Sequence, residues 1–281
     1  MRSVPKMAPA MERATIALRN IFMTTECRAA ATKRSDHNHT IHHRECVIVT
    51  LPGPMGGPVV HSMGVCMDDK QMERYGALAG IVFVVLNIIG SAMMGSPPAS
   101  DDSNEKVLEW FIDKDSGIKT AGFLGAISVI FMFWFLGTLW RHMSKAEGGT
   151  VRVSVVSAAG LIGSGALWTA AAAIQSAVAM RIDTDGAGAS GFMYALSAVL
   201  MAAAGAFVAA HLLATNLLAL RTKWLPSWHA GIGLLAGVGF VVSSAGTMTD
   251  SGGVMMIGMI SFLIWAVWII LTALQMYRKP A

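Results

Sequence analysis

The sequence has too few charged residues for an ordinary soluble domain. Only 14% of the 281 residues are charged, whereas 54% are hydrophobic and the mean hydropathy is +0.56. Soluble domains carry roughly 25% charged residues. The shortage of charge excludes a typical soluble enzyme and indicates an integral membrane protein.

Cysteine and excess positive charge are both missing from the main body of the chain. The three cysteines, Cys27, Cys46 and Cys66, lie in the first 66 residues, so no disulfide framework is expected in the apolar part. Residues 1–66 hold eight Lys or Arg against four Asp or Glu, and the remainder has thirteen of each. A nucleic acid is therefore not an expected partner of the main body.

The common catalytic motifs are absent as well. The chain has no P-loop, no HExxH, no GxSxG and no GxGxxG with an acidic residue at the spacing of a dinucleotide site. These absences argue against ATP-driven transport by this chain alone and against the commoner hydrolases. We assign no catalytic residue, no cofactor and no metal site.

Residues 1–70 form a polar segment that we predict to be mostly disordered. The segment contains five prolines and no sustained apolar period. Two explanations stay open: an organellar presequence, because the first 35 residues are rich in Arg and Ala, or a start codon assigned too far upstream of Met67 or Met72. The group His37, His39, His42, His43 and Cys46 has suitable metal ligands but matches no strict zinc spacing.

Six apolar stretches follow, each long enough to cross about 30 Å of hydrocarbon. We place them near residues 75–95, 119–141, 153–180, 190–220, 228–248 and 253–277. Their central parts contain no Asp, Glu, Lys or Arg, and they contain no proline. Since a lipid-exposed backbone must satisfy its own hydrogen bonds, the predicted fold is an all-α, polytopic transmembrane bundle of residues 71–281.

The short connections predict the orientation. Basic residues such as Arg141, Lys145 and Arg221 lie in alternate connections, and acidic residues such as Asp101 and Asp183 dominate the others. By the positive-inside rule, both ends of the bundle are expected on the cytoplasmic side.

The connection between the first two spans predicts a short amphipathic helix. Asp102 and Glu105 have capping-box spacing, and Gly117 is a natural helix stop. The apolar side would consist of Val107, Leu108, Phe111 and Ile112. Such a helix would lie on the outer leaflet or cap the bundle.

Small residues predict where helices approach closely, because lipid gives helices no hydrophobic reason to associate. Spans three, four and five are expected to form the tight interior, and spans two and six to face lipid more. The candidate packing residues are Gly160, Ser164, Ala202, Ala206, Ala210, Gly233 and Gly237.

Few polar side chains lie inside the spans, and these form the candidate site: Asn87, Gln175, His211, Thr215 and Asn216. His211 lies near mid-membrane, ten residues before Arg221, with Thr215 one turn later on the same face. An intramembrane histidine can serve as a proton relay, a metal ligand or a substrate contact. It can equally be a neutral imidazole bonded to a neighbouring helix.

Residues 75–279 resemble uncharacterised six-helix bacterial membrane proteins, known as domains of unknown function. The resemblance lies in the layout and in these residues: Ser96, Pro97, Pro98, Trp110, Phe111, Leu139, Trp140, Arg141 and Glu147. It implies a bacterial inner-membrane location and supplies no activity.

Three functional hypotheses follow. The first is a non-enzymatic component that interacts with lipid and with other membrane proteins or copies of itself, in envelope assembly or maintenance. The second is a small-solute or metabolite transporter with a cavity between spans three, four and five. The third is a membrane-embedded enzyme or redox partner acting through His211.

Overall fold

The computed structural model describes residues 44–45, 51–52, 58–59, 67–99, 102–182, 187–249 and 252–280. The chain forms two compact units, Met1–Gln71 and Met72–Ala281. In the first unit, strand β1 (Arg44–Glu45) pairs with β4 (Met67–Asp68), and β2 (Leu51–Pro52) pairs with β3 (Pro58–Val59), both antiparallel. The predicted disorder of residues 1–70 falls almost wholly outside the described residues, and the His and Cys group falls wholly outside them. The alternative start at Met67 or Met72 stays a prediction.

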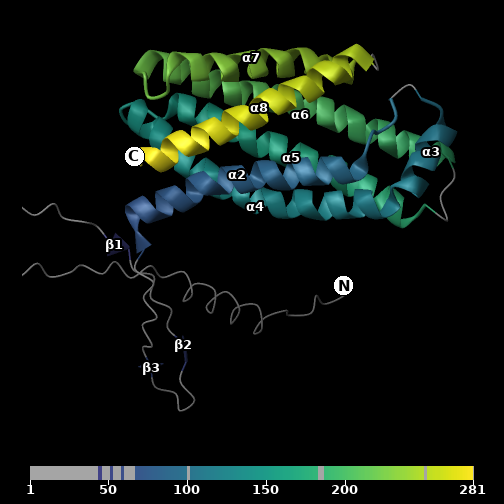
Figure 1. Cartoon of the computed structure of the whole chain (residues 1–281), viewed down its shortest axis with the longest axis horizontal. Coiled ribbons are helices and arrows are strands. Elements are labelled where there is room, and N and C mark those ends of the chain that lie inside the picture. Colours follow the sequence, from purple (N-terminus) through teal and green to yellow (C-terminus); the bar gives the residue numbers. More distant parts are fainter. Residues whose placement is uncertain are drawn as a thin grey trace, which may run out of the picture. The chain divides into compact units, whose positions relative to one another are not determined.

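The second unit is built of helices (Figure 1). They are α2 (Asp69–Met94), α3 (Asn104–Asp113), α4 (Asp115–Ala146), α5 (Arg152–Met180), α6 (Ala187–Thr222), α7 (Ser227–Ser243), the 3-10 turn η1 (Ser244–Thr247) and α8 (Gly252–Arg278). Six of the described helices are long and apolar enough to cross a membrane. The predicted all-α fold with six spans is confirmed.

α4 and α6 extend beyond their predicted spans because their polar ends stay helical in water or among headgroups, whereas α7 ends at Ser243, before its predicted end near residue 248. α4 continues to Ala146, past Arg141, and α6 continues to Thr222. At 36 residues, α6 is the longest. Periodicity and apolar length locate a span, but they do not locate the last turn of its helix.

Consecutive long helices run in opposite directions, which gives the bundle two distinct ends. α2, α5 and α7 begin at the end that holds Glu73, which we call the Glu73 end, and α3 covers the opposite end, which we call the α3 end (Figure 1). α6 packs against both α5 and α7, α4 packs against α5, and α7 packs against α8.

The interior is filled with large apolar side chains. Phe83 of α2, Phe135 of α4 and Trp265 of α8 belong to one buried cluster, and the rings of Phe83 and Trp265 meet edge to face at 5.9 Å. Trp265 and Trp268 of α8 are fully buried. Other large side chains of α8, such as Leu263 and Val267, are exposed, so the expectation that span six faces lipid more than the interior spans is compatible with these two buried tryptophans.

The short helix α3 begins differently from the prediction. Its N-cap is Ser103, whose hydroxyl accepts from the N–H of Lys106, while Asp102 instead accepts from the N–H of Ala99 and from the Lys106 ammonium. The helix ends at Asp113, and Gly117 lies inside α4, where an added Cβ would lie 2.4 Å from the carbonyl oxygen of Met93. Gly117 therefore permits a close helix contact and is not a helix stop.

α3 packs onto the bundle. Val107 and Phe111 are buried in a cluster with Ile118, Val178, Ala179 and Tyr194, whereas Ile112 is exposed. The hydroxyl of Tyr194 donates to the carbonyl of Pro98 at 2.5 Å. Of the two predicted positions for this helix, the structure has the one that caps the bundle.

Large apolar side chains also cover the outside of all six long helices. Examples are Val85 of α2, Phe133 of α4, Val155 of α5, Phe207 of α6 and Leu263 of α8. A soluble protein rarely exposes so much apolar surface. The surroundings of this bundle are therefore a lipid bilayer.

Candidate functional site

His211 lies at the centre of a hydrogen-bonded group that joins α5 to α6. Its Nδ1 lies 2.9 Å from the Ser157 hydroxyl and 3.1 Å from the Ser157 carbonyl oxygen. The Ser157 hydroxyl also lies 2.8 Å from the Thr215 hydroxyl, and Thr215 can donate to the His211 carbonyl at 2.8 Å. The side chains of His211 and Thr215 are fully buried. The sequence prediction that Thr215 shares a face with His211 thus agrees with the geometry, and Ser157 joins them.

A second group continues from α6 to α8 and α7. The indole N–H of Trp268 donates to the Asn216 side-chain oxygen at 3.0 Å, and the Asn216 amide donates to the Leu212 carbonyl at 2.8 Å. On the other side of Trp268, the Thr272 hydroxyl lies 3.0 Å from Nε2 of His229 and donates to the Trp268 carbonyl.

These two groups meet at Trp268, whose ring lies edge-on to both His211 and His229, with ring centroids 5.8 Å and 6.0 Å apart. We call the whole set the polar seam; it consists of Ser157, His211, Thr215, Asn216, His229, Trp268 and Thr272. It links four helices and lies in the half of the bundle nearer the Glu73 end, because His229 is the third residue of α7 and Ser157 the sixth of α5.

Sequence reasoning missed four members of the polar seam: Ser157, His229, Trp268 and Thr272. A serine or threonine in an apolar helix is common, and its partner on another helix cannot be read from spacing. His229 did carry a signal, since it is a polar residue at the start of predicted span five, three residues after Pro226.

The other two candidate residues lie apart from the polar seam. The Gln175 amide donates to the Ser197 hydroxyl at 3.0 Å, which joins α5 to α6 toward the α3 end. The Asn87 amide donates to the Ser128 hydroxyl at 3.1 Å and to the Phe83 carbonyl at 2.8 Å, which joins α2 to α4. The five predicted polar residues therefore do not converge on one site.

Two of the predicted packing glycines lie against the polar seam. A Cβ on Gly160 would lie 2.6 Å from the Phe207 carbonyl oxygen and 2.8 Å from the backbone nitrogen of His211. A Cβ on Gly233 would lie 2.1 Å from the side-chain amide nitrogen of Asn216. Real Cβ atoms do not approach backbone or rigid neighbours so closely. These glycines therefore set the distances at which α5 and α7 meet α6.

The remaining packing candidates differ in how deeply they are buried. Gly237 would bring a Cβ to 3.3 Å from Leu212, and Ser164 is buried with its hydroxyl donating to the Leu161 carbonyl of its own helix. Ala202 and Ala210 are half-buried, but Ala206 is exposed, contrary to expectation. The buried small residues of α6 lie on a neighbouring face, at Ala204 and Ala209.

Glu147 holds the start of α5 in place. Its carboxylate accepts from the N–H of Val153 at 2.8 Å, from the N–H of Ser154 at 2.9 Å and from the Ser154 hydroxyl. Burial raises the pKa of Glu147, but the Ser154 hydroxyl and the two N–H donors outweigh it and hold the pKa below its ordinary value of 4.5. The carboxylate thus stays charged and caps the helix N-terminus.

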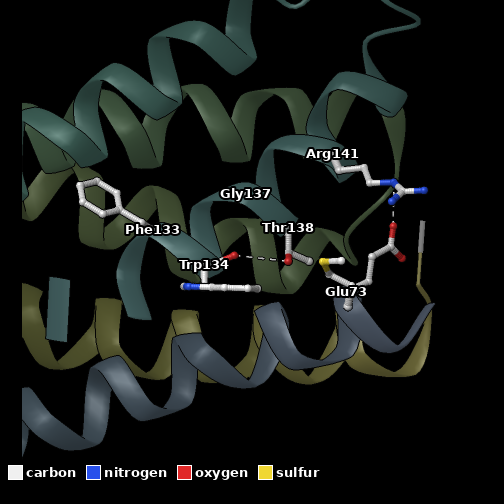
Figure 2. A pocket seen from close by; sticks show the side chains of 7 residues that line it. Glu73, Phe133, Trp134, Gly137, Thr138 and Arg141 are labelled. Atoms are coloured by element: carbon white, nitrogen blue, oxygen red, sulfur yellow. Dashed lines mark hydrogen bonds and ion pairs between the residues drawn. The ribbon is translucent and has the colours of Figure 1, made fainter. Parts of the chain in front are cut away.

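An open pocket lies between α2 and α4 near the Glu73 end (Figure 2). Its volume is about 360 Å³. We call it the α4 groove; it is lined by Met72, Glu73, Phe133, Trp134, Gly137, Thr138 and Arg141. Glu73 and Arg141 form an ion pair at one end, with Nε and Oε1 2.8 Å apart. A second pocket of about 30 Å³ is lined by His142, Trp224, Gln275, Met276 and Lys279.

Within the described residues, no group of three or more His, Cys, Asp or Glu side chains is arranged to hold a metal ion. The predicted His and Cys group of the N-terminal segment lies outside that part of the chain. Neither described pocket lies between α5, α6 and α7, where the transporter hypothesis places a cavity.

Comparison with known proteins agrees with this architecture. No curated protein and no solved structure matches the chain. One family profile, described as "Domain of unknown function (DUF4386)", matches residues 78–273, from the first span to the last. The resemblance expected from the layout of the spans is therefore confirmed, and the chain belongs to the DUF4386 family of membrane-spanning domains of unknown function.

Proposed function

We propose that this protein is a non-enzymatic membrane component that acts through its surface, by binding lipid or other membrane proteins. One observation carries the proposal: the candidate polar side chains inside the spans form hydrogen bonds to neighbouring helices. His211, Asn216, Gln175 and Asn87 each contact a partner on a neighbouring helix, at 2.9 to 3.1 Å. Groups engaged in this way hold a bundle together and are not displayed toward a solute.

The location that goes with this function is a bacterial plasma membrane, with both ends of the bundle in the cytoplasm. The charge distribution supports this orientation. Arg74, Arg141, Lys145, Arg221 and Arg278 lie near the Glu73 end. At the α3 end the charge is acidic on balance, since α3 and its flanks carry Asp102, Glu105, Glu109, Asp113 and Asp115 against Lys106, Lys114 and Lys119. Positive charge in short connections is retained on the cytoplasmic side.

A transport measurement tests the proposed function. Purified protein in liposomes is assayed for uptake of a panel of sugars, amino acids and monovalent cations, beside protein-free liposomes. We expect no saturable uptake. Saturable uptake would overturn the proposal in favour of the transporter, and its loss in His211→Ala, with equal amounts of folded protein in the vesicles, would assign His211 to the solute pathway.

A labelling measurement tests the orientation separately. In a variant without the native cysteines, Asp113→Cys and Lys279→Cys are treated with a membrane-impermeant maleimide on intact spheroplasts. Asp113→Cys should react at once, and Lys279→Cys should react only after permeabilisation. The reverse pattern would show that the basic end faces outward.

A further inference from the structure

The α4 groove differs from the rest of the lipid-facing surface because it is hollow and charged at one end. Phe133 and Trp134 are half-exposed, at 50% and 52%, and provide apolar walls. Gly137 lies between them and Arg141, with no atom within 4 Å of the position where a Cβ would stand. The missing side chain leaves the hollow open, as Figure 2 shows along α4 from Phe133 to Arg141.

The charged end of the α4 groove is asymmetric. The Glu73 side chain is 4% exposed, whereas the Arg141 side chain is 51% exposed. The buried carboxylate thus pairs with a guanidinium that stays half-exposed, and Figure 2 shows the two side chains meeting at this end of the groove. An arginine presented in this way offers planar, directed N–H donors to an anion such as a phosphate.

A second exposed cation lies at this end. Lys145 is exposed one helical turn beyond Arg141 on the same face of α4. On α2, Glu73 is buried and Asp69, one turn before it, is half-buried, so the exposed charges that α4 contributes here, Arg141 and Lys145, are both positive. Basic pockets between transmembrane helices, at the level of the headgroups, favour anionic lipids.

The two ends of the α4 groove are about 12 Å apart along the helix, because eight residues separate Phe133 from Arg141. The α4 groove is apolar toward the middle of the membrane and cationic at its Arg141 end. Its two ends therefore match a molecule that carries an acyl chain at one end and a phosphate at the other. From this geometry we infer that the α4 groove binds one anionic phospholipid, with its phosphate on Arg141 and an acyl chain against Phe133, Trp134 and Gly137. This inference deepens the proposed function by naming its lipid ligand.

Lipid titration followed by native mass spectrometry tests the inference. The delipidated full-length protein, in mild detergent, is titrated with phosphatidylglycerol and, separately, with phosphatidylcholine of the same acyl chains. We expect one phosphatidylglycerol to bind at least about tenfold more tightly, as expected for an interaction that gains a charge-assisted hydrogen bond and local positive charge. Equal binding of the two lipids would overturn the inference.

A matched pair of variants locates the lipid. Gly137→Leu fills the hollow, and Gly125→Leu adds the same side chain to the same helix at a position that also has no atom within 4 Å of its Cβ. Phosphatidylglycerol binding should weaken about tenfold or more in Gly137→Leu and stay unchanged in Gly125→Leu. Equal binding by both variants would exclude the α4 groove. A self-associated dimer that binds no lipid would assign the groove to a second copy and would likewise overturn the inference.

The charge is tested with a neutral pair. Glu73→Gln combined with Arg141→Gln removes both charges and leaves no buried carboxylate without its arginine. The double variant should lose the preference for phosphatidylglycerol over phosphatidylcholine while its melting temperature stays near that of the native protein. A retained preference in a folded double variant would remove Arg141 from the proposal.

A spectroscopic readout is independent of mass spectrometry. Phosphatidylglycerol with brominated acyl chains should quench part of the tryptophan fluorescence, and Trp134→Phe should remove that part. Quenching that is the same in Trp134→Phe would contradict the inferred acyl-chain position. Absence of solute flux together with failed lipid binding would refute only the lipid inference, whereas saturable flux would refute the proposed function itself.

Discussion

The polar seam and the α4 groove use the same kinds of residue to opposite effect. In the polar seam, Gly160 brings backbones together until no space remains, and the polar side chains are bonded to one another. In the α4 groove, Gly137 faces outward and leaves space, and the charged Arg141 remains half-exposed. The structural role of a glycine or a polar residue in a membrane helix can therefore be inferred only when it is known which side of the helix the residue lies on.

The largest expected effect is that of Gly160→Ala. The new Cβ would contact the backbone of Phe207 and His211 at less than 3 Å, so α5 and α6 would have to separate. We expect a loss of unfolding free energy of about 3 kcal/mol, the upper range of ordinary overpacking. Thermal unfolding in detergent measures it. Gly125→Ala, whose new Cβ would lie in open space, should be neutral or stabilise the protein by up to about 1 kcal/mol. Equal effects of the two substitutions would show that Gly160 is not a close-packing residue.

His211→Ala should have the next largest effect. The change removes the link from α6 to Ser157 and leaves a buried space beside Trp268. Loss of an interhelical hydrogen bond and of packing together should cost about 2 kcal/mol. The melting temperature should fall, whereas phosphatidylglycerol binding should not change, because His211 does not line the α4 groove. A variant with unchanged stability and altered lipid binding would contradict the division of roles.

Asn216→Leu should cost about 1 kcal/mol, because it leaves the buried Trp268 N–H without its acceptor. A double-mutant cycle with Trp268→Phe isolates this contact. If Asn216 acts through Trp268, the two losses should not add. Additive losses would show that the hydrogen bond contributes nothing measurable.

Glu147→Gln should have a smaller effect, about 1 kcal/mol or less, since the cap lies near solvent. The lowered pKa of Glu147 gives the direction of the pH dependence. The stabilisation is present above the ordinary pKa of 4.5 and is lost as the pH falls through the lower pKa of the folded state. The difference in melting temperature between the native protein and Glu147→Gln should therefore shrink in acid. A difference that grows below pH 4.5 would contradict this linkage.

Gly137→Ala should have the smallest effect on stability, within about 0.5 kcal/mol, because nothing lies near its new Cβ. Thermal unfolding beside Gly160→Ala gives the sharpest contrast between the two regions. A large destabilisation of Gly137→Ala would mean that Gly137 is a packing residue and that the α4 groove is closed in solution.

The fold could be predicted from the sequence because membrane spans follow from length and apolarity alone. The candidate site could be predicted only in part. His211 and Asn216 are conspicuous as polar residues inside apolar runs, but their partners Ser157 and Trp268 are not, since hydrogen bonds between helices depend on helix rotation. The α4 groove was missed for the same reason: Gly137 and Arg141 reveal nothing about a hollow until the outward face of α4 is known.

The length of α6 has a consequence for the membrane itself. Its 36 residues extend about 54 Å, against about 30 Å of hydrocarbon in a typical bilayer. Because α6 is packed against both α5 and α7, it cannot tilt independently to match a thinner bilayer. A change in bilayer thickness should therefore tilt the whole bundle together with α6. The acyl-chain length of the lipid thus influences the tilt of all the packed helices.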